Sequence, residues 1–273
     1  MKLIIDASTQ GSGGGKRHLN EILKEFIKGK YPISKIYIWA PLSLLKILPE
    51  NPLIIKKTTK LLNKGLFTNF IWQFFFRDSD FRRIDHDCIY SPYGNYNGKI
   101  RPYITMSRNM LMFEDSERKK FGISFLRLKL KILSFIQKKS FINSNGIIFL
   151  SKYAKRYITK KIGHNFISSK VINHGVSSEF RKKPKKQLPI STYSNNKPFK
   201  FLYVSNILPY KYHLNILSAI GDLLNNGYPI QLTLVGKVDS ELLGRKVSKQ
   251  VKLINKKHNA VKWFRNVNIT KVK

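Results

Sequence analysis

The sequence is poor in cysteine and in acidic residues, and it has no long hydrophobic run. Cys88 is the only cysteine among 273 residues, which excludes a disulfide framework and fits a reducing compartment. No apolar stretch reaches the roughly 20 residues that a membrane-spanning helix needs. The apolar start Met1–Ile5 is interrupted by Asp6 and is too short for a signal-peptide core. These absences predict a cytoplasmic protein.

The scarcity of acidic residues gives the chain an extreme charge. Lysine and arginine number 51 against 15 aspartates and glutamates, so the formal net charge is +36. Such a field attracts nucleic acid, anionic lipid surfaces and phosphorylated ligands. The sequence has no zinc-ligand cluster, no recognisable RNA-binding module and no Arg/Gly-rich tail, so nucleic acid is not favoured as a partner. An anionic membrane surface and a phosphate-bearing ligand remain as expected partners.

The stretch Phe201–Gly236 contains two apolar runs with a helical pattern between them. Phe201–Val204 and Gln231–Val235 suit buried strands. Between them, apolar residues recur at helical spacing until Asn and Gly end the pattern. The apolar residues are Leu214, Leu217, Ala219, Ile220, Leu223 and Leu224. The stretch therefore predicts a βαβ unit with parallel strands and a right-handed crossover.

The loop after Val204 ends at Lys211, just before the predicted helix. Ligands of open parallel sheets bind beyond the carboxyl ends of the strands. Free N–H groups at a helix start attract anions, and a lysine adds a positive charge. The loop is therefore a candidate phosphate site, although an ordinary exposed lysine gives the same pattern.

Two further loops of the predicted α/β fold carry candidate ligand contacts. The first strand, Lys2–Asp6, is followed by a glycine-rich turn and a helix, where a ligand can approach the backbone unless the turn is merely a flexible surface loop. Arg108 and Asn109 follow the predicted strand Pro102–Met106. They belong either to a site at its carboxyl end or to a simple polar loop. Further strands are predicted at Lys35–Ala40, Pro52–Lys57, Cys88–Tyr93, Gly146–Leu150, Lys170–His174 and Ala260–Phe264.

Two helical segments have patterns that also suit a membrane surface. Phe67–Phe76 is strongly aromatic and predicts a buried helix, with a membrane-touching helix as the alternative. Ile123–Ile142 predicts a long helix with an apolar row and a mostly basic row. The pattern fits a core helix with a solvated face or a helix lying on anionic lipid. The apolar row is Leu126, Leu130 and Leu133, flanked by Leu128, Ile132 and Phe135, and the other row is Arg127, Lys131, Ser134 and Lys138.

The segment around Lys211 resembles the donor-binding unit of glycosyltransferase family 4, whose members are retaining nucleotide-sugar enzymes with the two-domain GT-B fold. The likeness rests on the strand Phe201–Ser205, the loop that ends at Lys211, and the strand that ends at Gly236. In that family an arginine five positions before the lysine also holds the donor diphosphate. Here Asn206 occupies that place. The resemblance implies that Lys211 and Asn206 lie at the donor diphosphate.

Other segments resemble the same family. The glycine-rich loop aligns with a family loop that faces the cleft near the donor phosphate and the acceptor, and similar members often carry Arg-Asn where Arg108 and Asn109 stand. The turn Asn173–Val176 with Phe180 resembles the family's interdomain turn. The residues that the resemblance places on the cleft or acceptor side are Gly13, Gly14, Gly15, His18, Arg108 and Asn109.

The resemblance implies an α/β protein of the GT-B type, with two Rossmann-like parallel-sheet domains. We expect an acceptor-side domain at residues 1–180, a linker at 181–198 and a partial donor-binding domain at 199–273. The family's Glu-x7-Glu motif has no counterpart in this sequence. We therefore expect the second domain to be incomplete and the chain to be truncated at its C-terminus.

The implied function is transfer of a sugar from a nucleotide-sugar donor to a lipid-linked or polysaccharide acceptor in cell-surface glycan biosynthesis (lipopolysaccharide, O-antigen or capsule). The resemblance implies no metal and no cofactor, and a place in the cytoplasm or on the inner face of the plasma membrane. The alternative is a catalytically dead fragment or a basic polyanion-binding protein. The sequence does not identify the sugar, the nucleotide or the linkage.

Overall fold

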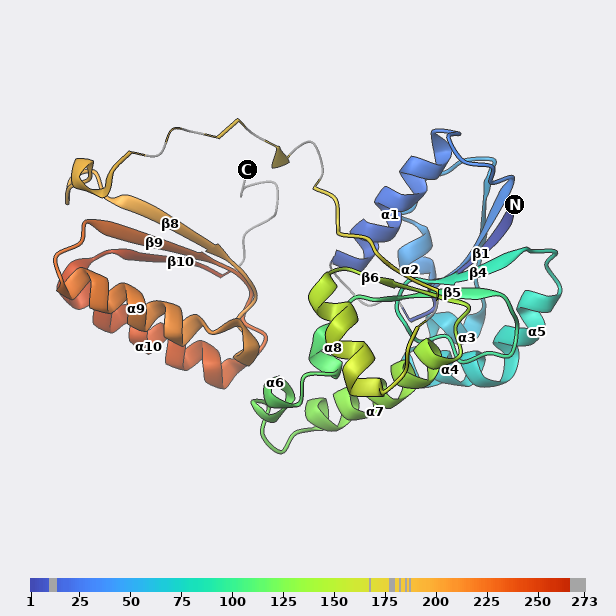
Figure 1. The fold of residues 1–273 in the computed structure, drawn as a ribbon. Helices are drawn as coiled ribbons and strands as arrows, with labels where there is room; N and C mark the ends of the chain where they lie inside the picture. Colours follow the sequence, from blue (N-terminus) through green and yellow to red (C-terminus); the bar gives the residue numbers. More distant parts are fainter. Residues whose placement is uncertain are drawn as a thin grey trace. The chain divides into compact units, whose positions relative to one another are not determined.

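The computed structural model describes residues 1–9, 14–166, 168–176, 180–181, 183–184, 186 and 188–265. The chain divides into two compact units (Figure 1). Unit 1 comprises Met1–Arg118 and Ile123–Val176, and unit 2 comprises Lys119–Gly122 and Ser177–Lys273. Each unit is built on its own parallel sheet.

Unit 1 contains a seven-stranded parallel sheet in the order β3-β2-β1-β4-β5-β6-β7. Its strands are β1 (Lys2–Asp6), β2 (Lys35–Trp39), β3 (Ile54–Lys57), β4 (Cys88–Ser91), β5 (Tyr103–Ser107), β6 (Gly146–Phe149) and β7 (Ser169–Val171). Its helices are α1 (Gly14–Ile27), α2 (Leu42–Leu45), α3 (Lys60–Asn63), α4 (Leu66–Ile71), the π-helix η1 (Trp72–Phe76), α5 (Arg77–Arg82), the 3-10 helix η2 (Met110–Met112), α6 (Asp115–Lys119), α7 (Phe125–Ile142) and α8 (Lys152–Ile162). The strands predicted for this region are confirmed to within a few residues.

Helices cover both faces of the sheet of unit 1, so its central strands are apolar on both sides. Side chains alternate along a strand, and β1 follows this rule. Leu3 and Ile5 pack with the α1 residues Leu19 and Leu23. Ile4 lies on the other face, in the cluster that contains Trp72 and Phe81. The sheet is thereby held between α1 and the α3–α5 segment.

Unit 2 contains a three-stranded parallel sheet in the order β10-β9-β8. Its strands are β8 (Phe199–Val204), β9 (Ile230–Val235) and β10 (Val261–Phe264), and its helices are the 3-10 helices η4 (Ile190–Thr192) and η5 (Pro209–Lys211) with α9 (His213–Asn225) and α10 (Glu241–His258). The predicted βαβ unit is confirmed, with Phe201 paired to Leu232. The predicted burial of its first strand is wrong in part. Among the described residues β8 is an edge strand, and Leu202 and Val204 are exposed.

Gly236, directly after β9, packs against the backbone of the neighbouring loop. A Cβ at this position would lie 1.8 Å from the carbonyl oxygen of Ser205. We expect Gly236→Ala to destabilise unit 2 by about 3 kcal/mol or more, because neither backbone can move without breaking the sheet edge. The matched control is Gly221→Ala inside α9, where the nearest atoms are side-chain carbons of Ile254 at 3.8 Å. That change should stabilise by about 0.5–1 kcal/mol. Urea unfolding of both variants measures the contrast, and equal stabilities would contradict it.

Candidate functional site

A buried ion pair lies at the carboxyl end of β1. Asp6 Oδ2 is 3.3 Å from the guanidinium of Arg77, and both side chains are almost fully buried. Asp6 Oδ1 accepts hydrogen bonds from the backbone N–H and the hydroxyl of Ser8, at 3.2 and 2.6 Å. The guanidinium also stacks 4.3 Å from the ring centre of Tyr96. The pair ties the end of β1 to the start of α5.

Two amides of the α4–η1 segment continue this arrangement. The side chain of Asn69 donates to the carbonyl of Ser8 at 2.6 Å, and Gln73 donates to the side chain of Asn69. The residues of α4 and η1 that follow β3 are thus tied to the loop that follows β1. One turn of this segment is a π-helix, and single π-turns occur frequently at functional sites.

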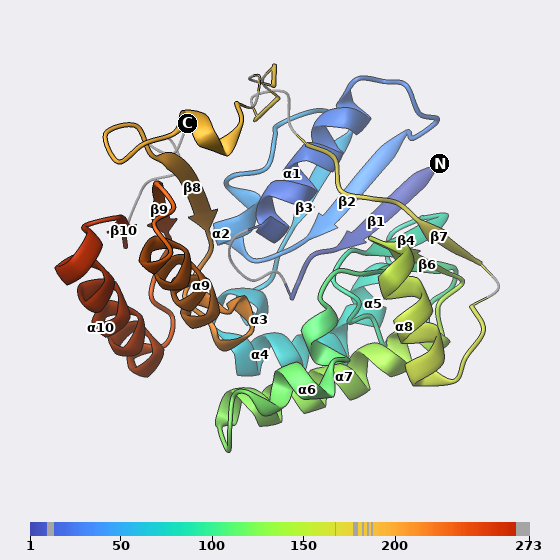
Figure 2. The same ribbon diagram turned by 60° about the vertical axis from the view of Figure 1, so that its left-hand side comes forward.

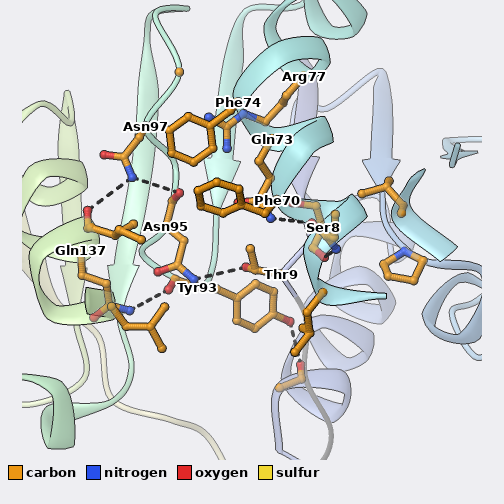
Figure 3. Close-up of a pocket in the computed structure, with 18 of the residues that line it drawn as sticks. Ser8, Thr9, Phe70, Gln73, Phe74, Arg77, Tyr93, Asn95, Asn97 and Gln137 are labelled. Carbon is orange, nitrogen blue, oxygen red and sulfur yellow. Dashed lines mark hydrogen bonds between the residues drawn. The ribbon is translucent and has the colours of Figure 1, made fainter. Parts of the chain in front are cut away.

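A cavity of about 1050 Å³ opens at this edge of unit 1. Parallel sheets bind their ligands beyond the carboxyl ends of the strands, and the loops after β1, β4 and β5 all line this cavity. Figure 3 shows the rings of Phe70 and Phe74 extending toward Asn95 and Asn97. The polar lining comprises Ser8, Thr9, Ser43, Asn63, Asn69, Gln73, Arg77, Asp78, Tyr93, Asn95, Asn97, Lys99, Arg108, Asn109, Lys129 and Gln137, and the apolar lining includes Leu66, Phe70, Phe74, Leu133 and Ile136.

The loop after β4 is held by amide hydrogen bonds. Gln137 of α7 donates to the carbonyl of Tyr93 at 3.0 Å, and the Tyr93 hydroxyl donates to the carbonyl of Gly15 at 3.3 Å. Asn97 donates to the Ile136 carbonyl at 3.4 Å. The Oδ1 atoms of Asn95 and Asn97 are buried, and no donor in the described part of the chain reaches them. Unpaired buried acceptors need a donor, and hydroxyl groups of a ligand in the cavity would supply it.

The structure places the predicted cleft residues as follows. Gly13 lies outside the described residues. Gly14 and Gly15 form the first turn of α1, and of these two Gly15 lines the cavity. Arg108 and Asn109 line it as well, and the Asn109 side chain caps η2 by accepting from the N–H of Leu111 at 3.0 Å.

His18 is the remaining predicted residue of this group. It is not among the residues that line the cavity, and it packs against a second histidine. The rings of His18 and His174 meet edge to face, 4.8 Å apart. Burial lowers the pKa of His18 from 6.5 to about 4, with smaller contributions from Arg108 and His174. Arg108 itself stacks 5.1 Å from the ring centre of Tyr93, and burial raises the pKa of that tyrosine to about 12. At neutral pH the imidazole of His18 and the phenol of Tyr93 are therefore neutral beside the Arg108 guanidinium.

We expect the imidazole of His18 to titrate near pH 4 in histidine NMR spectra. Because this pKa lies below the unfolded value of 6.5, protons bind more tightly to the unfolded chain, and unfolding free energy should fall as the pH drops from about 6.5 toward 4. Arg108→Gln should raise the pKa of His18 while leaving it below 6.5, since burial is the larger cause. A His18 signal that titrates at 6.5 would show that the side chain is solvated.

Most polar residues of the cavity were not identified from the sequence. Asn95 and Asn97 follow a predicted strand, so the rule that ligands bind at the carboxyl ends of parallel strands would have found them. Asn69, Gln73 and Gln137 carry no such signal, because they lie inside helices. Tertiary packing alone brings them to the cavity.

Two Asp-x-Asp sequences, Asp78–Asp80 and Asp85–Asp87, occur in unit 1. Their carboxylates serve the fold. Asp78 accepts from the backbone N–H of Lys99 at 2.6 Å, and Asp80 accepts from the indole of Trp72 at 2.8 Å. Asp85 pairs with the Lys2 ammonium, and Asp87 accepts from the Lys2 backbone. In the described parts of the chain, no three His, Cys, Asp or Glu residues are placed to hold a metal ion.

In unit 2, the residues predicted to contact the donor diphosphate lie on the loop between β8 and α9. Lys211 ends η5 and is exposed, with its ammonium 5.2 Å from the ring centre of Tyr210. Its backbone carbonyl accepts from the Tyr203 hydroxyl at 2.8 Å. Asn206 donates to Asp239 at 2.9 Å. No side chain of the described residues caps the N-terminus of α9, so its first N–H groups can donate hydrogen bonds to an anion.

Comparison with solved structures finds nucleotide-sugar enzymes and other glycosyltransferases. HepE from Anabaena, crystallised with UDP-glucose, matches with a TM-score of 0.60 and 14% identity, over 98% of this chain and 70% of HepE. The lipopolysaccharide outer-core galactosyltransferase WaaB matches with a TM-score of 0.57 and 14% identity, over 100% of this chain and 70% of WaaB. A glycosyltransferase from Rickettsia africae has a TM-score of 0.58 and 15% identity, over 98% of this chain and 68% of its own.

The chain has the GT-B glycosyltransferase fold. The GT-B assignment agrees with the two parallel sheets, of which the second is the smaller in the described residues. No protein-family model and no curated protein matches the sequence. At 14–15% identity, the likeness establishes the fold, and the activity has to be argued from the residues of the two units.

Proposed function

We propose that this chain is a nucleotide-sugar-dependent glycosyltransferase of family 4, with retaining stereochemistry and a glycan acceptor. The observation that carries the proposal is a cavity at the sheet edge of a GT-B fold, lined by amides, hydroxyls and aromatic rings together with the charged residues Arg77, Asp78, Lys99, Arg108 and Lys129. Amide and hydroxyl groups recognise sugar hydroxyls, and aromatic rings pack against the apolar faces of sugar rings. WaaB acts on lipopolysaccharide, which supports a lipid-linked acceptor in cell-surface glycan biosynthesis.

Under this proposal unit 2 binds the donor. Lys211 and the free N–H groups of α9 hold the diphosphate, and Asn206 lies at the same loop. The leaving nucleoside diphosphate gains negative charge as the glycosidic bond breaks, and preplaced cations and N–H groups stabilise that charge. HepE binds UDP-glucose, which supports a nucleoside diphosphate as the common part of the donor.

Unit 1 binds the acceptor under the same proposal. Asn95 and Asn97 accept hydrogen bonds from hydroxyl groups of the acceptor sugar. Arg108 lines the same cavity, and the neutral His18 lies outside the lining but interacts electrostatically with Arg108. These groups orient the acceptor hydroxyl, and such positioning accounts for a large part of catalysis in transfer reactions.

The proposal is tested by calorimetric titration of the chain with UDP, GDP, ADP and inorganic pyrophosphate. Selective binding of one nucleoside diphosphate over pyrophosphate supports a donor site. Binding is the appropriate measurement, because the proposed donor site consists of residues of unit 2 and a titration reports on that site directly. Equal binding of all four anions, weakening steeply with salt, would favour the alternative of a basic polyanion-binding protein.

The net charge of +36 also supports peripheral binding to anionic membranes. Lys131 and Lys138 of α7 are exposed. We expect sedimentation with vesicles that contain 30% anionic lipid, and retention should fall at least fivefold when salt rises from 50 to 500 mM, because screening weakens charge attraction. Equal retention on neutral and anionic vesicles would overturn this electrostatic account. Within the described residues no helix is long and apolar enough to cross a membrane.

A further inference from the structure

Helix α7 has an exposed apolar face. Its buried residues are Leu130, Gln137, Ser140 and Phe141. Of the apolar row Leu126, Leu130 and Leu133, Leu130 alone is buried, so the core-helix alternative holds only in part. Residues spaced three and four apart share one side of a helix, and the opposite side of α7 carries large apolar side chains. These residues, with their exposed fractions, are Phe125 (82%), Leu128 (55%), Ile132 (53%) and Phe135 (71%).

The aromatic segment Leu66–Phe76, which forms α4 and η1, is exposed as well. A buried helix was predicted there, and the structure contradicts it. Only Asn69 and Trp72 are buried, because the other rings point away from the sheet. The exposed rings are Phe67 (76%), Phe70 (48%), Phe74 (60%), Phe75 (76%) and Phe76 (48%). Water-exposed aromatic rings at this density mark a contact surface.

These two apolar ridges, Leu66–Phe76 and Phe125–Ile142, flank the cavity of unit 1. Both views place α4 beside α7 (Figures 1 and 2). Leu66, Phe70 and Phe74 line the cavity from one ridge, while Lys129, Leu133 and Ile136 line it from the other. The outermost apolar side chains of each ridge therefore stand on either side of the cavity.

The charges of the two ridges favour an anionic lipid surface over a second copy of the chain as the partner. Neither Leu66–Phe76 nor Phe125–Ile142 contains an acidic residue, whereas the second ridge contains Arg127, Lys129, Lys131, Lys138 and Lys139. Apolar side chains with lysines beside them and no acidic residue suit the boundary between lipid headgroups and acyl chains. A second copy of the chain would bring the same positive charges onto these lysines.

We propose that the two ridges insert into an anionic bilayer, so that the cavity between them opens at the membrane surface. This inference rests on the proposed function for its purpose, since a lipid-linked acceptor would enter the cavity from the bilayer. It goes beyond charge attraction, because insertion requires the apolar ridges themselves.

The test uses the single cysteine of the chain. In a Cys88→Ser background, single cysteines at Phe75, Phe135 and Tyr31 are labelled with an environment-sensitive fluorophore. Tyr31 is 50% exposed and belongs to neither ridge. With vesicles of 30% phosphatidylglycerol, the labels at positions 75 and 135 should shift to the blue and be quenched by lipids brominated on their acyl chains. The label at position 31 should do neither.

Binding variants give the second measurement. Phe75→Ser combined with Phe135→Ser leaves the charge unchanged and should weaken vesicle binding at least tenfold at 150 mM salt. Tyr31→Ser is the matched control and should bind as the parent does. Unchanged binding of the double variant would overturn insertion, and so would labels that stay quenchable by water-soluble iodide on the vesicles.

Two further outcomes keep this inference separate from the proposed function. Blue-shifted labels without lipid, together with a dimer that the double variant abolishes in sedimentation, would identify the ridges as a subunit interface and overturn the proposal. Nucleoside diphosphate titration of the double variant should match the parent. Loss of membrane insertion with intact nucleotide binding would therefore reject the insertion surface alone, whereas absent nucleotide binding would reject the transferase.

Discussion

Arg77→Met is expected to lower the free energy of unfolding of unit 1 by about 3–5 kcal/mol. The substitution leaves the Asp6 carboxylate buried beside Ser8 with its cationic partner removed, and only 4% of the Asp6 side chain is exposed. Within the described residues, only the N–H and hydroxyl of Ser8 then remain as hydrogen-bond partners of the carboxylate, so the cost is that of a poorly compensated buried charge. The stack on Tyr96 is lost at the same time.

The matched control is Arg83→Met. Arg83 lies 3.9 Å from Asp80 and its side chain is 78% exposed, so this ion pair is solvated and its loss should cost no more than about 1 kcal/mol. Combining Arg77→Met with Asp6→Asn should recover part of the stability, because the double variant carries no buried charge.

Tryptophan fluorescence provides the measurement. Trp39 and Trp72 stack with their ring centres 5.4 Å apart in the core of unit 1, and Trp263→Phe removes the remaining tryptophan, which lies in unit 2. Urea unfolding in that background follows unit 1 by itself. Equal urea midpoints for Arg77→Met and Arg83→Met would show that the buried ion pair contributes no more to stability than the exposed one.

Much of the fold could be predicted from the sequence, because alternation and helical spacing are local signals. The run Lys2–Asp6 gave the correct bounds of β1, and the Phe201–Gly236 stretch gave the correct order of strand, helix and strand. The α/β class with two parallel sheets is confirmed. Local patterns cannot say which apolar residues of a helix meet the core. In α7 the row residue Leu130 is buried, whereas the flanking residues Leu128, Ile132 and Phe135 are exposed.

The candidate site could be predicted only where it follows a strand. Arg108 was found because it comes directly after β5, and it lines the cavity. The partner of Asp6 could not be found, since Arg77 lies 71 residues further along the chain. The contact of Gln137 could not be predicted either, since Gln137 lies in α7 and donates to Tyr93 in the loop after β4. The roles of Lys211, Asn206 and the cleft residues in ligand binding stay predictions.

Exposure of the aromatic segment was also beyond the sequence. Phe67–Phe76 has the composition of a core helix, and composition alone predicts burial. The segment is tied down by polar groups instead, through Asn69 and Gln73, and by the Trp72 side chain, which packs with Trp39 and Phe81. With the inward side so occupied, the phenylalanines are left on the outside. Exposed phenylalanines cost stability in water. Insertion into a bilayer, as proposed above, gives this exposed apolar surface a function.

Lys211→Ala is expected to weaken the binding of nucleoside diphosphate by roughly ten- to a hundredfold. The family that the segment resembles holds the diphosphate with an arginine and a lysine, and Asn206 stands at the arginine's place. Lys211 is exposed on the loop before α9, and within the described part of the chain no carboxylate pairs with it. A charged hydrogen bond to phosphate contributes about 1.5–3 kcal/mol, which gives the expected loss in affinity.

Lys211→Arg and Lys252→Ala complete the experiment. Arginine keeps the charge but presents a planar fork in place of a compact ammonium, so Lys211→Arg should recover only part of the affinity. Lys252 is exposed on α10, and Lys252→Ala removes the same charge from unit 2 away from the loop. If long-range charge alone drew in the nucleotide, the two alanine variants would lose affinity equally and would regain it equally at low salt. A loss confined to Lys211→Ala, persisting at 300 mM salt, places the diphosphate in direct contact with the Lys211 ammonium at the N-terminus of α9.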